Sequence, residues 1–366
     1  MPVDVRLAER ECSLVDGLGE DEGMSIRFPA PLRPGDRIGV TSPSAGVTAE
    51  LLPRFEFCLE WLRSAGYDVV VGDCMDGRGP VSAPAKERAV EMTSMLLDPT
   101  INAVVPPWGG ELAVEILPYL DFAEIAGAAP TWLVGFSDLS TLLLPLTTLA
   151  GVATLYGQNL MDTPYRVPQP LRSWLNMAGA QPGTTIVQGP STTHRTSGFD
   201  RWQDDPGIVE FTLNSPGTWS LLEPGSDGLD VSGRLIGGCI ETVSTLAGTR
   251  YGDLPAFARD HAGDEGLILY LEAAEDAPFN IARNLWRMRL AGWFDSANAV
   301  LFARTGAPDP PAFGQLDAVR SALMGLDIPV VVDVDCGHLP PHLALINGAL
   351  THVVINRASK TITQQR

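Results

Sequence analysis

The strongest constraint on the fold is an alternation of short apolar runs with helix-patterned segments between residues 36 and 150. The apolar runs have the length of buried strands, and the segments after them carry apolar residues three or four positions apart. The predicted strands cover residues 37–42, 68–71, 101–105 and 132–136, and the predicted helices cover residues 48–65, 85–97 and 112–120. Repeated strand–helix units predict an α/β fold with a parallel sheet flanked by helices. The ligand crevice of such a sheet lies beyond the carboxyl ends of its strands.

The length of 366 residues predicts more than one domain, because a single hydrophobic core stops growing at a smaller size. We expect an N-terminal α/β domain at residues 25–161 and a C-terminal α/β domain at residues 221–366, with the active site at their interface. The second domain has predicted strands at 266–272, 299–303 and 329–334 and predicted helices at 240–246 and 281–291. Residues 1–24 are interpreted as a disordered acidic leader.

Residues 162–220 differ from both flanking regions, because prolines are frequent and the apolar periodicity fades. We interpret this segment as an interdomain linker and substrate loop rather than a core element, since long structured loops in compact proteins are usually functional. A solvated linker is the alternative.

Charge and composition exclude several classes of function. The net charge of −19 disfavours binding to nucleic acid or to an anionic membrane. No run approaches the length of a membrane span, and the acidic start lacks the features of a secretory signal. Five cysteines without paired spacing indicate a reducing cytoplasm, and the five histidines form no ligand motif, so neither a metal nor an organic cofactor is expected.

Ser137 stands where the predicted strand 132–136 ends and an apolar helical segment begins. A strand–serine–helix corner exposes the serine oxygen at the top of a sheet, beside the first N–H groups of the helix, which suits a nucleophile. The local sequence, Gly-Phe-Ser-Asp-Leu, lacks the second glycine of the usual G-x-S-x-G corner. A serine here can equally be the N-cap of the next helix.

Two more residues of complementary chemistry follow apolar strands. Glu272 ends the predicted strand 266–272, where a carboxylate without a partner would be costly to bury, and His338 follows the strand 329–334. A serine nucleophile needs a base, and the imidazole needs an acceptor that fixes its tautomer. Singly, Glu272 could face solvent and His338 could be an ordinary loop histidine. Together with Ser137 they predict a catalytic triad.

An acyl-transfer site also needs N–H donors for the oxyanion that develops. The amide of Asp138, first in the new helix, is one candidate, and the amide of Gly110 is the second. Glycine allows the backbone to approach a ligand closely. A simple tight turn at Gly109–Gly110 is the alternative.

From about residue 32 to residue 348 the sequence resembles the serine LD-carboxypeptidase family, which includes the microcin C self-immunity peptidases. The similar segments, in chain order, are residues 32–44, 109–110, 116–121, 135–138, 233–238, 246–251, 269–272 and 335–338. The resemblance implies a two-domain serine peptidase whose nucleophile falls on Ser137, whose acid falls on Glu272 and whose base falls on His338. It also implies oxyanion amides near Gly110 and Asp138, and we expect a homodimer.

Two features bear on the substrate. Cys239 stands where the family usually has asparagine after a double glycine, so we expect a substrate contact at Cys239. The long segment 162–220 is similar to the immunity-peptidase branch, where an aromatic residue of this loop stacks on a nucleotide base. An exposed Trp202 beside Arg201 would suit an adenylated peptide or acyl-sulfamoyl adenosine. The alternative is that Trp202 only packs the loop onto the body.

The expected function is a cytoplasmic serine peptidase or amidase of the microcin-immunity-like branch, which cleaves an amide in a peptidyl- or aminoacyl-nucleotide. One alternative is a murein tetrapeptide LD-carboxypeptidase of cell-wall recycling. An alternative of another class is a ligand-binding or sensor protein that keeps the cleft and hydrolyses nothing. A nucleotide-dependent α/β enzyme is disfavoured, because the first strand and loop lack both glycine-rich phosphate motifs.

Overall fold

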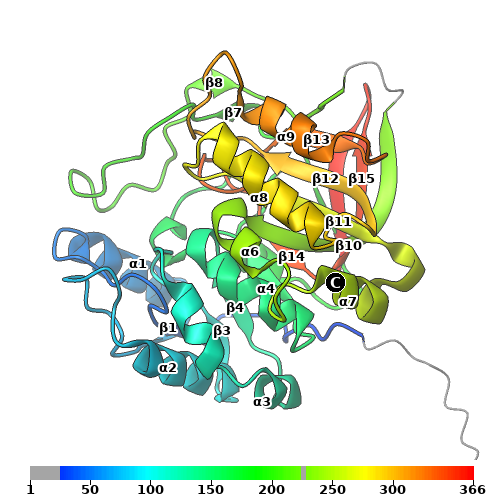
Figure 1. The fold of residues 1–366 in the computed structure, drawn as a ribbon. Coiled ribbons are helices and arrows are strands. Elements are labelled where there is room, and N and C mark those ends of the chain that lie inside the picture. The colour runs from blue at the N-terminus through cyan, green and yellow to red at the C-terminus, as the bar shows by residue number, and fades with distance from the viewer. Residues whose placement is uncertain (1–24, 224–227) are drawn as a thin grey trace, which may run out of the picture.

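The computed structural model describes residues 25–223 and 228–366 and shows a two-part α/β fold, as expected (Figure 1). The N-terminal half lies in the lower part of Figure 1, and helices α8 and α9 of the C-terminal half lie at the top. The predicted acidic leader, residues 1–24, is outside the described residues. Among the helices of the described ranges, none combines the length and the apolar character needed to traverse a bilayer.

The first sheet confirms the predicted parallel arrangement. Its strand order is β14-β5-β4-β3-β1-β2, and only β14 runs antiparallel to its neighbour. The strands are β1 Arg37–Val40, β2 Asp68–Val71, β3 Ile101–Val104, β4 Trp132–Gly135, β5 Thr154–Tyr156 and β14 Leu345–Asn347. The pattern of apolar runs therefore located four of these strands, whereas β14 comes from the far end of the chain.

Helices of the N-terminal half differ from the prediction at three places, because α3 was not predicted and two other segments differ in their bounds or type. They are α1 Leu52–Ser64, α2 Ala85–Leu97, α3 Phe122–Gly127 and α4 Ser140–Thr148, with 3₁₀ turns η1 Ala113–Tyr119, η2 Ser137–Leu139 and η3 Leu160–Asp162. Helix α1 begins later than expected, because Pro53 favours the first turn of a helix. The predicted helix at 112–120 is wrong: this segment is the 3₁₀ helix η1, and Pro118 inside it lacks the N–H that a continuing α-helix needs.

The second sheet has the strand order β6-β16-β15-β10-β11-β12-β13-β9, with parallel pairing from β10 to β13. Its strands are β6 Thr185–Gln188, β9 Ser220–Leu221, β10 Leu229–Cys239, β11 Leu267–Glu272, β12 Ala297–Ala303, β13 Val330–Val334, β15 Leu350–Ile355 and β16 Lys360–Gln365. The helices of this half are α6 Ile240–Leu246, α7 Leu254–Phe257, α8 Pro278–Leu290 and α9 Gln315–Leu323. Helix α8 packs between α6 and α9.

Residues 162–220 are more than an interdomain linker and substrate loop, because they also contribute strands to the second sheet. Strand β6 pairs with β16 and strand β9 pairs with β13, so the segment supplies both edges of the second sheet. It also contains helix α5 (Trp174–Gly179) and the small β-ladder of β7 (Thr193–His194) with β8 (Ser215–Pro216). These strands have two to four residues, which is too short for a visible apolar periodicity.

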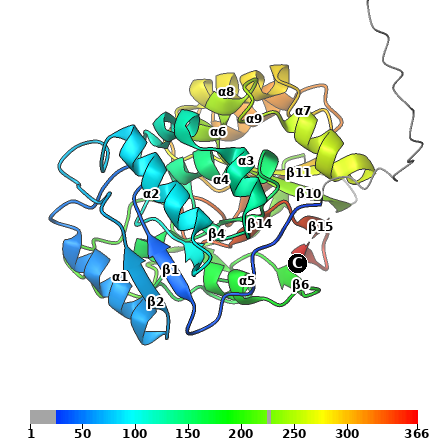
Figure 2. The ribbon, with the colours of Figure 1, turned by 90° about the horizontal axis from the view of Figure 1, so that it is seen from below.

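The two halves share elements rather than meeting at a simple boundary. Helix α4 is buried almost all round, because it packs on the first sheet and also contacts β10 and α6 of the second half. Strand β14 closes one edge of the first sheet and contacts β10, and Figure 2 shows it between the two sheets. The carboxyl end of β4 and the carboxyl end of β11 therefore meet at the same place.

Candidate active site

Ser137 lies at a sharp corner between β4 and α4. Its φ of +64° is in the left-handed region, which serine seldom adopts and which costs of order 1–3 kcal/mol. The side chain is not an N-cap, because Phe136 and Leu139 occupy the two cap positions of the following turn and helix. Instead Oγ of Ser137 is 3.0 Å from Nε2 of His338. The structure thus shows the strained strand-to-helix corner that exposes a serine oxygen.

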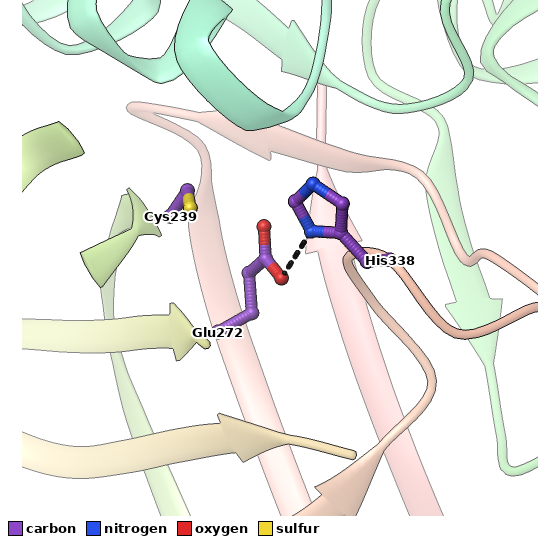
Figure 3. A group of neighbouring side chains, drawn as sticks. All are labelled: Cys239, Glu272 and His338. Carbon is purple, nitrogen blue, oxygen red and sulfur yellow. Dashed lines mark hydrogen bonds and ion pairs between the residues drawn. The ribbon is translucent and has the colours of Figure 1, made fainter. Parts of the chain in front are cut away.

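His338 joins Ser137 to Glu272. Its Nδ1 lies 2.8 Å from Oε2 of Glu272, the contact drawn in Figure 3, while its Nε2 contacts Ser137. Glu272 is the last residue of β11, and His338 follows β13 in the loop that leads back toward β14. The structure therefore brings together the three residues that the sequence predicted, in one hydrogen-bonded row.

Glu272 is fully buried, so the alternative of a solvent-facing strand end does not apply. Its Oε1 accepts a hydrogen bond of 2.6 Å from the hydroxyl of Tyr156, and its Oε2 faces His338. The loop passes very close to this carboxylate: a Cβ on Gly337, whose φ is +87°, would come within 2.3 Å of Oε2. Glycine at this position is what allows His338 to reach its partner.

The charges of Glu272 and His338 stabilise each other. Burial alone would raise the pKa of Glu272, but the charge of His338 and the hydrogen bonds from His338 and Tyr156 outweigh it and hold that pKa below 4.5. Burial would likewise lower the pKa of His338, yet the Glu272 carboxylate raises it above 6.5. His338 can accept a proton only in its neutral form. Because its pKa is raised, this form predominates only at a pH above the pKa of an ordinary histidine.

The loop after β3, which contains Gly109 and Gly110, lies directly against Ser137. A Cβ on Gly109 would lie 2.9 Å from Cβ of Ser137 and 3.1 Å from the amide nitrogen of Asp138. Gly110 follows with a φ of +142° and lines the cleft. The Asp138 side chain is buried and accepts hydrogen bonds from Ser44 Oγ (2.6 Å) and the Ala113 amide (2.8 Å). This carboxylate holds the glycine loop and the serine corner in contact.

A cleft of about 630 Å³ opens beside Ser137 and His338. One side is an aromatic wall that runs away from the serine, in the order Phe136, His342, Phe211, Tyr165 and Trp202. Neighbouring ring centroids are 5.2 Å apart for the first pair, 5.8 Å for the second and 4.2 Å for the third, which is stacked. Such a surface suits a flat apolar group some distance from the reacting bond.

Trp202 combines the two roles that the sequence left open. It lines the cleft, but it is half-buried rather than exposed, and its Nε1 donates a 2.9 Å hydrogen bond to the Tyr165 hydroxyl. The guanidinium carbon of Arg54 lies 5.3 Å from the Trp202 ring centroid. Arg201 also lines the cleft, and its guanidinium pairs with Asp204 at 2.7 Å. Trp202 therefore lines the cleft in a position fixed by Tyr165 and Arg54.

Arg54 is a site-shaping residue that sequence reasoning missed. It is fully buried on α1, donates twice to the Met161 carbonyl and also binds the carbonyls of Pro206 and Ile208. These bonds fix the loop that carries Trp202 over α1. The available signal was its position, because Arg54 falls on the apolar face of a predicted helix, where a charge needs partners.

Further charged residues line the cleft without having been predicted as site residues. Arg195 and Asp200 form a nearly buried ion pair. Burial raises the pKa of Asp162 to about 6 despite the opposing charge of Arg54. Charged side chains of both signs therefore line the cleft together with the aromatic wall.

Cys239 was expected to contact substrate; in the structure it lies near Glu272 but is buried and does not line the cleft. Its side chain is buried at the end of β10, where Sγ donates to Oε2 of Glu241 at 3.1 Å. Its backbone amide donates a 3.0 Å hydrogen bond to the Ser140 hydroxyl oxygen. Figure 3 shows it on the side of Glu272 away from His338. Ligand atoms of Cys239, Glu272 and His338 lie within 4.8 Å of one another, a spacing compatible with a metal ion. The direct Glu272–His338 bond already uses two of these atoms.

A serine on a strand-to-helix corner, joined through an imidazole to a buried carboxylate, is the arrangement of serine peptidases. The chain belongs to the LD-carboxypeptidase family of serine peptidases: residues 38–157 match the N-terminal domain of that family and residues 232–353 match its C-terminal domain.

Curated relatives and a solved structure agree with this assignment. A putative carboxypeptidase of Vibrio cholerae is 26% identical over 321 residues, which cover 84% of this chain and 89% of that protein. The microcin C7 self-immunity protein MccF of Escherichia coli is 26% identical over 359 residues, which cover 92% and 95%. The structure of MccF in complex with aspartyl sulfamoyl adenosine has a TM-score of 0.78 at 23% identity, covering 92% of this chain and 98% of that one. The fold is shared across nearly the whole length.

Proposed function

We propose that this protein is a serine peptidase of the microcin-immunity-like branch, which cleaves an amide in a peptidyl- or aminoacyl-nucleotide. The observation that carries the proposal is the row from Ser137 through His338 to Glu272 at the reacting end of the cleft. The aromatic wall that leads from it to Trp202 supports a substrate with a flat ring. The complex of MccF with aspartyl sulfamoyl adenosine supports the same substrate class.

In the proposed mechanism His338 Nε2 takes the hydroxyl proton of Ser137 as Oγ attacks the substrate carbonyl carbon. The amides of Gly110 and Asp138 donate to the oxyanion, and Glu272 stabilises the imidazolium that forms. His338 then gives its proton to the leaving nitrogen as the C–N bond breaks, which leaves an acyl-enzyme. Water attacks this ester with His338 again as base, and the acid product and free Ser137 result.

The substrate branch is tested by incubating the protein with an aminoacyl-sulfamoyl adenosine and, separately, with a murein tetrapeptide. Hydrolysis of the first is the expected result, and hydrolysis of the second alone would favour the cell-wall alternative. A serine-directed fluorophosphonate tests the sensor alternative. We expect it to label Ser137 and to lose that reaction in His338→Ala, whereas a ligand-binding protein without an activated serine would not react in either form.

Replacing Gly109 with alanine tests the close approach of the glycine loop to Ser137. The added Cβ would displace the loop from the serine corner, so kcat should fall about 100-fold, the range for a lost oxyanion donor. Gly127→Ala is the matched control, because nothing lies within 4 Å of a Cβ at that exposed site. Unchanged kcat in Gly109→Ala would show that this loop takes no part in the reaction.

Trp202→Ala tests the role of the aromatic wall. Loss of the ring should raise KM for an aminoacyl-nucleotide about tenfold or more while the rate of fluorophosphonate labelling stays unchanged, because Ser137 lies at the other end of the wall. Trp202→Phe keeps a flat ring and should show a smaller effect. Trp61→Ala, which removes a half-buried tryptophan of α1 that does not line the cleft, is the control. Equal KM values for Trp202→Ala and the control would contradict stacking.

The protein is further proposed to act in the cytoplasm as a homodimer. The four cysteines of the described residues are all unpaired, which fits a reducing compartment. Phe279, Trp286 and Leu290 on α8 leave apolar surface exposed, which supports association.

A further inference from the structure

His342 occupies an unusual position in the cleft. Its side chain is only 5% exposed, and neither ring nitrogen has a hydrogen-bond partner among the described residues. The ring is held between Phe136 and Phe211, with centroid distances of 5.2 and 5.8 Å. Its backbone is fixed as well, because the carbonyl accepts a 2.9 Å bond from Gln158 Nε2. A polar ring is therefore held in apolar surroundings at the wall of the cleft.

An unpartnered imidazole is a poor choice for packing alone. A buried polar group without a partner destabilises the folded protein, whereas an apolar side chain of similar shape at the same position does not. The neighbouring rings Phe136 and Phe211 would accept such an apolar side chain. The ring nitrogens of His342 therefore find a hydrogen-bond partner only when a ligand enters the cleft.

The ring is uncharged at neutral pH. Burial, assisted by the charge of His338, lowers the pKa of His342 to about 3. A neutral imidazole carries one N–H donor and one acceptor nitrogen. It therefore offers no net charge to a phosphate or a carboxylate, but it can complete a hydrogen bond with a hydroxyl, a carbonyl or an amide.

The place of His342 in the aromatic wall defines which part of a ligand it meets. Phe136 directly precedes Ser137 in the chain, and Phe211 stacks on Tyr165, whose hydroxyl binds Trp202. His342 thus lies between the reacting end and Trp202. A group facing it belongs to the part of the substrate between the scissile amide and the flat ring.

We propose that His342 is a specificity-determining residue that hydrogen-bonds an uncharged polar group of the substrate, a hydroxyl or a carbonyl, between the scissile amide and the ring at Trp202. This inference rests on the proposed function and deepens it. Binding of substrate would satisfy a nitrogen that the free protein leaves unpaired, so the side chain exchanges some stability of the free protein for substrate selection.

The test compares His342→Met, His342→Gln and the control His352→Met, in which the same change is made at a half-exposed histidine of β15. With an aminoacyl-sulfamoyl adenosine as substrate, His342→Met should lower kcat/KM about tenfold or more, mainly through KM. The ligand-free protein should at the same time melt roughly 1–3 °C higher, because an unpaired polar group has been removed. His342→Gln keeps a donor and an acceptor and should restore much of the lost affinity.

A second substrate, the analogue without ribose hydroxyls, identifies the group. If the loss in His342→Met disappears with this analogue, the ribose is the partner; if the loss persists, the partner is on the aminoacyl side, and both results support the inference. An unchanged KM with a lower Tm would overturn it, since His342 would then be structural. If the wild-type protein cleaved no aminoacyl-nucleotide, the proposed function would fail and this role of His342 would fail with it; cleavage by the wild-type protein with an unchanged KM in His342→Met would overturn the role of His342 alone.

Discussion

Replacing Ser137 with alanine is expected to lower kcat by about 10⁴-fold or more. Alanine removes Oγ, which is the only atom of this residue that can form the acyl-enzyme. The fold should persist, because alanine and serine meet the same backbone strain at a φ of +64° and Ser137 caps no helix. Turnover of an aminoacyl-sulfamoyl adenosine and the melting temperature are the two measurements.

Ser94→Ala, at an exposed position of α2, controls for the loss of a hydroxyl. It should keep full activity. If Ser137→Ala retained the wild-type rate with a wild-type melting temperature, Ser137 would not be the nucleophile, and the hydrogen bond to His338 would have another purpose.

Glu272→Gln should reduce kcat by about 10³- to 10⁴-fold. The amide can still accept from the Tyr156 hydroxyl, but its NH₂ group would then face Nδ1 of His338 and favour the tautomer that carries the proton on Nε2. That tautomer cannot accept the proton of Ser137. The exposed residue Glu56 on α1 gives the control Glu56→Gln, which makes the same change of charge.

The same variant should move the pH dependence. In the wild-type protein the Glu272 charge raises the pKa of His338, so kcat/KM should fall as the pH drops through a value above 6.5. Removing that charge leaves burial opposed only by the smaller effects of Glu241 and Asp162, so the pKa of His338 falls and the acid limb of Glu272→Gln should lie at lower pH. A limb that stayed in place would show that another group titrates there.

Local pattern was enough to locate the N-terminal sheet. The strands β1 to β4 and helix α2 carry regular apolar spacing, and their bounds agree with the prediction within two residues. Pairings between distant segments were not visible, because nothing in residues 345–347 indicates an antiparallel partner at 154–156. The edge strands β6 and β9 were missed for a different reason, since four and two residues are too few to show an apolar periodicity.

The reacting end of the site was predictable because each residue follows an apolar strand and its chemistry needs the other two. The residues that shape the rest of the cleft could not be predicted from the sequence. Arg54 and His342 act through burial, which depends on which loop covers them, and Cys239 is buried because Ser140 of α4 packs against the end of β10. Polar residues whose role comes from distant neighbours leave no pattern in the local sequence.

The proposed nucleophile and its base are 201 positions apart in the chain, and β14, which closes the sheet beneath the serine, comes later still. During translation at about 5 to 20 residues per second, the ribosome therefore releases the serine corner about 10 to 40 s before the histidine. A nascent chain would carry an inert hydroxyl throughout that interval. The proposed triad is then complete only after the chain has been made past His338 and both sheets have formed.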